Sequence, residues 1–257
     1  MIHTLKDKWQ PLLWLGLFVG LYILASQAID FNLAVFLTSI PGFIRFIIVE
    51  FLPPNLTALP LYVEPILNTI FVSILTSVIG ALLAFGFALL IAKRTTPFPK
   101  VAIAIRGALA FVRNIPMMVW ASLFVIIVGI GITAGVVALV FFSVSFLSRV
   151  FADALDDIDK GTLEALTSNG ASKLALIHHV MIPEFLPTFY GWVLFLFEIN
   201  IKASSILGLV GAGGLGYELK KSLDLFKYRD ASALILVIVV LMITVEMISN
   251  KIRKAIL

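Results

Sequence analysis

The stretch from Asn114 to Ser148 reads NIPMMVWASLFVIIVGIGITAGVVALVFFSVSFLS, 35 residues without one charged side chain. A single helix of that length would exceed the bilayer core about twofold, because about 20 apolar residues already cross it. Gly129, Gly131 and Gly135 lie in the middle of the stretch. We therefore predict that the chain turns at these glycines and crosses the membrane twice, once before them and once after them.

The composition of the whole chain agrees with a membrane location. Hydrophobic residues make up 61% of the 257 residues, and charged residues make up 13%. A soluble domain carries roughly 25% charged residues, so this chain has too little polar surface to cover a globule in water. It contains no cysteine, which excludes thiol catalysis, thiolate metal sites and disulfides. The net charge of +4 is typical of cytoplasmic loops in a membrane protein, not of nucleic-acid binding.

Apolar runs along the rest of the chain predict a single all-α polytopic membrane domain over residues 1–257. The six spans expected are residues 11–29, 65–92, 106–129, 132–151, 187–207 and 231–248. The first run is longer than the core of a cleaved signal peptide, so we interpret it as an uncleaved helix. Residues 31–64 contain Arg45, Glu50 and Pro41, and an interfacial helix fits them better than a seventh span.

Lysine and arginine set the orientation. With six spans, twelve of the 19 basic residues fall on the side of the two termini and five on the other side. Cytoplasmic loops carry the excess of basic residues, so we expect both termini in the cytoplasm.

The longest polar insert, residues 156–183, lies between the fourth and fifth spans on the expected cytoplasmic side. Its pattern predicts a helix, a break and a second helix. Gly170 suits the left-handed position that ends a helix, and Ser172 can cap the next one. Pro183 cannot continue a helical hydrogen-bond ladder, so it predicts a boundary or a kink. Taken alone, the insert is either an ordinary amphipathic connector or a surface for a soluble partner.

The same insert resembles the loop shared by permeases of binding-protein-dependent ABC importers. That loop reads Glu-Ala-Ala, three residues, Gly, nine residues, Ile, any residue, Leu-Pro. Here Glu164, Ala165 and Leu166 begin it, Gly170 is in register, and Ile182 and Pro183 end it without a gap. The resemblance implies a type I importer permease fold. It also implies that the residues of this loop form a coupling helix docked on the ATP-binding subunit; the coupling candidates are Glu164, Ala165, Gly170, Ala171, Ser172 and Pro183.

Charged and amide side chains inside the predicted spans are candidates for a translocation pathway. Glu198 and Lys202 share a face of the fifth span at i and i+4, with Asn200 between them. A lone charge in the bilayer centre costs at least about 2.5–3.5 kcal/mol, so we expect these groups to face the bundle interior. They either pair with each other for packing or line the substrate path. Arg113 and Asn114, before Pro116, either mark the membrane boundary or lie beside a route for anions.

A glycine-rich turn follows the fifth span at Gly211, Gly213, Gly214 and Gly216. It satisfies the dinucleotide fingerprint literally, but that fingerprint requires a strand–turn–helix unit, and here a membrane span precedes it. We expect a tightly turned backbone instead. The run from Phe197 to Tyr228, with its Glu-x-Asn-x-Lys segment and this turn, resembles permeases of phosphonate import systems. Lys202 stands where that branch usually has arginine.

What the resemblance implies is a subunit without catalytic residues, metal or cofactor. As a homodimer in the bacterial inner membrane, it would form the pathway for phosphonate or a related phosphorus oxyanion. Two ATP-binding subunits would hydrolyse ATP, and a periplasmic or lipid-anchored binding protein would deliver the substrate. An importer for another solute, such as methionine, is the alternative within the family. An ion channel and an intramembrane enzyme are less compatible, because the insert resembles a docking loop and no Asp or His falls inside the spans.

Overall fold

The computed structural model describes residues 6–256, with the side chains of all but residues 6–8, 160 and 162. Every regular element in this range is helical. The chain forms two units, the first ending at Leu52 and the second beginning at Pro53.

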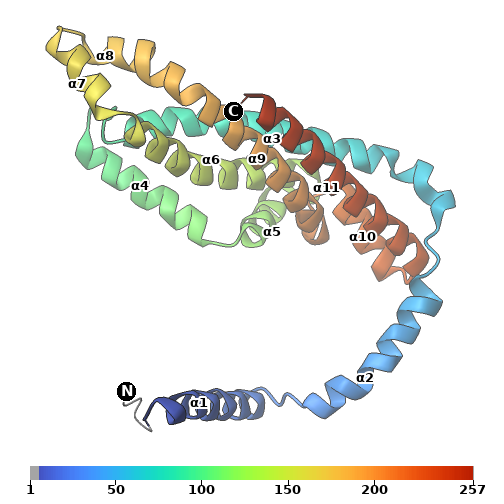
Figure 1. Cartoon of the computed structure of the whole chain (residues 1–257). Coiled ribbons are helices and arrows are strands. Elements are labelled where there is room, and N and C mark those ends of the chain that lie inside the picture. Colours follow the sequence, from blue (N-terminus) through green and yellow to red (C-terminus); the bar gives the residue numbers. More distant parts are fainter. Residues whose placement is uncertain (1–5, 257) are drawn as a thin grey trace. The chain divides into compact units, whose positions relative to one another are not determined.

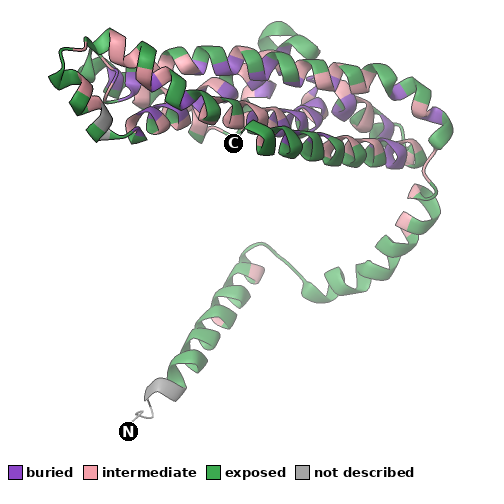
Figure 2. Cartoon of the chain, turned by 45° about the horizontal axis from the view of Figure 1, so that its top comes forward, coloured by how far each residue is buried: buried purple, intermediate pink, exposed green. Residues whose placement is uncertain are grey.

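The first unit contains α1 (Lys6–Ala28) and α2 (Leu33–Phe46), which continues as a π-helical turn to Phe51. Asn32 caps α2, since its Oδ1 accepts hydrogen bonds from the backbone N–H groups of Ala34 and Val35 at 2.9 and 3.3 Å. No described side chain of this unit is buried, as the green ribbons of α1 and α2 show (Figure 2). Apolar surface of this extent needs lipid or another protein to cover it.

Residues 33–51 are long and apolar enough to cross a membrane, despite Pro41 and Arg45. The helix occupies the first part of the segment 31–64 that the sequence predicts to be interfacial. Its length and hydropathy would also suit a membrane span, and no membrane is present in the structure. The interfacial placement of this helix therefore stays a prediction.

The second unit is a helical bundle whose elements are shown in Figure 1. Its long helices are α3 (Val63–Ile91), α6 (Ile132–Asp157), α9 (Ile182–Leu207) and α11 (Tyr228–Ile256). Its shorter elements are η2 (Leu56–Tyr62), α4 (Pro99–Asn114), α5 (Met117–Val128), α7 (Lys160–Ser168), α8 (Lys173–Leu176), η3 (Ile177–Met181), η4 (Gly208–Val210) and α10 (Gly214–Asp224).

Helices α3, α6 and α9 form the centre of this bundle, and small residues let them approach closely. The buried face of α3 consists almost entirely of small side chains: Thr69, Ser73, Thr76, Ser77, Gly80, Ala81, Ala84 and Ala88. Such residues allow helix backbones to pack tightly in lipid, where no hydrophobic force drives helices together. Toward the end of the bundle that carries α7, aromatic rings take over, with Phe151 of α6 against Phe185 of α9 at 5.2 Å between centroids.

The predicted third span, residues 106–129, is not one continuous helix. It is divided into α4 and α5, which are bent by 90° relative to each other. The bend falls at Ile115 and Pro116, both in extended backbone conformations, and Pro116 supplies no N–H to continue the ladder. The other five predicted spans each lie mainly within one long helix.

Candidate translocation and coupling sites

The insert predicted to couple to a partner forms two short helices, α7 and α8, joined by a turn at Gly170. Gly170 has a φ of 85°, the left-handed conformation that the sequence predicts for it. The Ser172 Oγ accepts a hydrogen bond from the backbone N–H of Ala175 at 3.2 Å, so the predicted cap is confirmed. Pro183 lies in the first turn of α9, directly after the π-helical turn η3, which confirms the predicted boundary.

Helices α7 and α8 enclose a hollow of about 450 Å³. Its lining includes the apolar side chains of Leu163, Leu176 and Met181 and the charged side chains of Arg94, Glu164 and Lys173. The side chains of Glu164 and Ala165 are exposed, and Ala171 is half-buried. The lining of the hollow is therefore partly apolar and partly charged.

This coupling segment, α7 to η3, is tied to the loop that joins α3 to α4. The Lys173 Nζ donates to the backbone oxygen of Thr96 at 3.1 Å. The backbone N–H of Arg94 donates to Asp156 Oδ1 at 3.1 Å, and its guanidinium donates to the backbone oxygen of Ile158. These hydrogen bonds join the loop between α3 and α4 to α8 and to the end of α6.

Asn200 is fully buried where α3, α6 and α9 meet. Its Nδ2 shares its hydrogens among the hydroxyl oxygens of Thr76, Ser77 and Ser143 at 3.1, 3.0 and 3.3 Å. The hydroxyls of Thr76 and Ser77 donate their own hydrogens to the Ser73 backbone oxygen, so their oxygens are free to accept. The Asn200 Oδ1 is buried without a partner among the described residues. Asn200 thus binds three helices together, as a polar residue in a membrane bundle is expected to do.

The predicted pair of Glu198 and Lys202 is wrong. The Glu198 carboxylate instead accepts a hydrogen bond from Arg253 Nη2 at 2.6 Å, and its side chain is 9% exposed. Lys202 is exposed and forms no ion pair with any described side chain. Spacing along one helix placed the two charges on one face, but it could not reveal a stronger partner on another helix.

Arg253 was missed because it lies near the end of the last helix, among basic residues assigned to the cytoplasm. It is in the last turn of α11, while Glu198 lies more than halfway along α9. The two meet because α9 extends past the end of α11, as the position of the C-terminus beside α9 shows (Figure 1). The sequence does offer a signal for this pair. Glu198 is a carboxylate inside one predicted span, and Arg253 is an arginine shortly after the end of another.

Arg113 is half-buried at the end of α4, and its Nη1 donates to the backbone oxygen of Ser145 on α6 at 3.0 Å. Asn114, the last residue of α4, is exposed. The two residues therefore point to different environments, and neither is close enough to Glu198, Asn200 or Lys202 to form a hydrogen bond with them in the described structure.

The glycine-rich turn docks against α3 and the beginning of α6, and it carries a helix that the sequence did not predict, α10. Gly211, Gly213 and Gly214 have φ values of 95°, 80° and 70°, so the expected tight turn is confirmed. The Thr69 Oγ1 of α3 accepts a hydrogen bond from the backbone N–H of Leu215 at 3.0 Å. Gly216 lies against α9, where a Cβ would stand 1.8 Å from the Ser205 backbone oxygen.

A family model described as the binding-protein-dependent transport system inner membrane component matches residues 84–256. The chain belongs to this family. The match covers the coupling segment, the glycine-rich turn and all the candidate pathway residues, so it applies to the part of the chain that carries the predicted sites.

Two curated permeases are similar to this one over most of its length. The phosphite transport system permease protein PtxC of Stutzerimonas stutzeri is 32% identical over 205 residues, covering 80% of this chain and 74% of the relative. The phosphate-import permease protein PhnE of Mycolicibacterium smegmatis is 32% identical over 254 residues, covering 98% of this chain and 47% of the relative.

A solved structure gives the fold of the permease. The inward-facing MetNI methionine ABC transporter contains a chain with a TM-score of 0.68 and 20% identity, covering 79% of this chain and 99% of that one. The permease therefore has the type I ABC importer fold and is a multi-pass component of the inner membrane.

Proposed function

We propose that this permease forms the pathway by which a phosphorus oxyanion, namely phosphonate, phosphite or phosphate, crosses the inner membrane. The observation that carries the proposal is the 32% identity to a phosphite permease over 80% of the chain. The half-buried Arg113 is consistent with an anionic substrate, and we assign Arg113, Asn114, Asn200 and Lys202 to the neighbourhood of the path.

ATP hydrolysis belongs, in this proposal, to two ATP-binding subunits, each of which docks on the coupling segment of one copy in a homodimer of this chain. The hollow between α7 and α8, which Glu164 helps to line, supports this role. A binding protein outside the membrane delivers the substrate and selects it. Glu198 acts with Arg253 in holding helices together.

Uptake in a strain that lacks its own phosphite and phosphonate importers tests the proposal. Cells that express the permease with its ATP-binding subunit and binding protein should accumulate labelled phosphite or methylphosphonate, and uptake should cease without the binding protein. Gly170→Val should abolish binding-protein-stimulated ATP hydrolysis, because valine at a φ of 85° strains the turn of the coupling segment. Accumulation of methionine in place of phosphorus oxyanions would contradict the proposed substrate, and unchanged hydrolysis in Gly170→Val would contradict the coupling role.

Both termini of the chain are cytoplasmic in this proposal, and α2 lies at the surface of the inner membrane that faces away from the cytoplasm. The chain contains no cysteine, so single cysteines report their own accessibility. Asp30→Cys, between α1 and α2, should react with an impermeant maleimide added outside, and Lys254→Cys should react only after permeabilisation. Protection of Asp30→Cys from outside would show that α2 crosses the membrane and that the first span runs in the opposite direction.

A further inference from the structure

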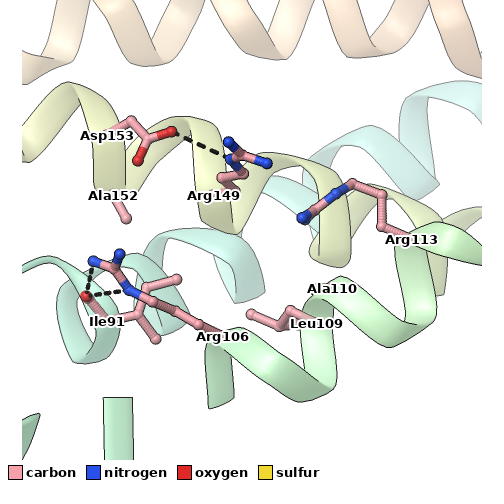
Figure 3. A pocket seen from close by; sticks show the side chains of 8 residues that line it. All are labelled: Ile91, Arg106, Leu109, Ala110, Arg113, Arg149, Ala152 and Asp153. Atoms are coloured by element: carbon pink, nitrogen blue, oxygen red, sulfur yellow. Dashed lines mark hydrogen bonds and ion pairs between the residues drawn. The ribbon is translucent and has the colours of Figure 1, made fainter. Parts of the chain in front are cut away.

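A hollow of about 260 Å³ lies between α4 and α6, and three arginines line it (Figure 3). Arg106 and Arg113 come from α4, and Arg149 comes from α6, together with Asp153. In the close-up view, the side chains of Arg113 and Arg149 reach toward each other from the two helices (Figure 3). The hollow is slightly smaller than the roughly 300–1,000 Å³ of typical small-molecule sites, so it suits a small ion or a headgroup.

Each arginine uses only part of its hydrogen-bonding capacity on the protein. Arg113 donates through Nη1 to the Ser145 backbone oxygen. Arg149 reaches Asp153 through Nε at 3.5 Å, which leaves both its terminal nitrogens without a partner among the described residues. A guanidinium has five N–H donors, so most donors of Arg113 and Arg149 remain for a ligand.

Arg106 differs from the other two arginines, because most of its guanidinium contacts are made with neighbouring residues of the chain. Its Nε and Nη2 donate to the backbone oxygen of Ile91, the last residue of α3, and Nη2 lies 3.6 Å from Asp156 Oδ2. It contributes positive charge to the hollow from a fixed place. Of the four charged side chains that line the hollow, three are positive and one is negative. Asp156, which does not line the hollow, partly neutralises the charge of Arg106.

We propose that this hollow is an oxyanion site, in which the guanidinium groups of Arg113 and Arg149 bind a phosphoryl-type group beside the fixed charge of Arg106. The planar fork of arginine binds two oxygens of such a group at once, which lysine cannot do. The group is either a free phosphorus oxyanion or the phosphate of a lipid headgroup. Both present the same oxygens, and the experiment below separates them.

The hollow lies at the end of the bundle that carries the coupling segment. Asp156, the partner of Arg106, also accepts the backbone N–H of Arg94 and lies in the last turn of α6 before α7. If the coupling segment faces the cytoplasm, as the proposed function requires, the hollow is where an imported anion leaves the permease. Only this role rests on the proposed function; the binding itself does not.

Binding is tested with the full-length permease in dodecyl maltoside, which contains no phosphate. Inorganic phosphate and methylphosphonate are titrated by calorimetry, and retained phosphatidylglycerol is measured by native mass spectrometry. Arg149→Gln and Arg113→Gln should each weaken binding of the group about tenfold, since each removes a charge-assisted hydrogen-bond donor set. Arg149→Lys keeps the charge and loses the fork, so it should weaken binding less than Arg149→Gln.

Lys220→Gln is the matched control, because it removes an exposed cation on α10, outside the hollow. It should leave binding unchanged.

Arginine-dependent binding of the free anions assigns the site to solute, and arginine-dependent binding of phosphatidylglycerol alone assigns it to lipid. Absence of both, or equal binding by all variants, would overturn the site. Loss of anion binding in Arg149→Gln with normal uptake would refute the exit role while leaving the site, and anion binding without phosphorus uptake in the intact system would refute the proposed function alone.

Discussion

Helices α9 and α4 both carry polar side chains that the sequence singles out, and the structure uses them in different ways. On α9, Asn200 donates to three hydroxyls of neighbouring helices, and Glu198 is bound by Arg253. On α4, Arg113 makes one hydrogen bond to the protein and keeps its other donors. A polar group surrounded by partners from its own chain stabilises the bundle, whereas one with spare donors beside a hollow can bind a ligand. Breaking the contacts of α9 should therefore cost stability, and matched changes at exposed positions should not.

The largest expected effect follows from removing Arg253. Arg253→Ala leaves the Glu198 carboxylate, 9% exposed, without its cation, and breaking a buried pair in this way costs about 3 kcal/mol. The thermal unfolding midpoint of the permease in detergent should fall by several degrees. Lys202→Ala is the control, since Lys202 is exposed and forms no ion pair with a described side chain, and it should leave the midpoint unchanged. If both variants unfold at the same temperature, the pair between α9 and α11 does not stabilise the bundle.

A smaller loss is expected from a single methyl group at the contact between α10 and α9. In Gly216→Ala the new Cβ would lie 1.8 Å from the Ser205 backbone oxygen, so the two backbones must separate. Overpacking of this kind costs about 1–3 kcal/mol. The same substitution at Gly107 of α4, where no atom lies within 4 Å, should be neutral or slightly stabilising. Equal unfolding midpoints for the two variants would contradict the close contact of α10 with α9.

The smallest loss is expected at Asn200. Asn200→Ala removes the hydrogen bonds to Thr76, Ser77 and Ser143, and hydrogen bonds between membrane helices contribute about 1 kcal/mol. Asn114→Ala, at the exposed last residue of α4, is the control for the loss of an amide. A midpoint for Asn200→Ala equal to that of the control would show that Asn200 does not hold the three helices together.

Local backbone features were predictable because they depend on few residues. The turn at Gly170, the cap at Ser172 and the boundary at Pro183 follow from the conformations that these residues allow, and the structure shows all three. The long helices were predictable because their apolar runs are long and uninterrupted. Each of these features is set within a few turns of the chain.

Features that depend on distant parts of the chain could not be predicted in the same way. The partner of Glu198 is 55 residues away, and the sequence gives no register between α9 and α11. The cluster of Arg106, Arg113 and Arg149 was hidden because two members were counted as loop charges. The 90° bend at Pro116 exceeds the kink that one proline usually implies. Helix α10 is a short amphipathic helix, and the N–H group of its Leu215 is bound by Thr69, far away in the sequence on α3.

The path from the coupling segment into the bundle has a mechanical consequence. From Lys173 to Leu207 the chain is helical throughout, as α8, η3 and α9, and it is gripped at Asn200 by two other helices. Treated as a rigid rod with 1.5 Å per residue, it has arms of about 40 Å and about 10 Å on the two sides of that grip. Such a rod is a lever with a ratio of about four to one, which reduces a movement at the coupling end about fourfold beyond Asn200 and multiplies the force by the same factor. If the ATP-binding subunit docks on this segment, as we propose, its large, weak motion would become a small, strong one beyond Asn200.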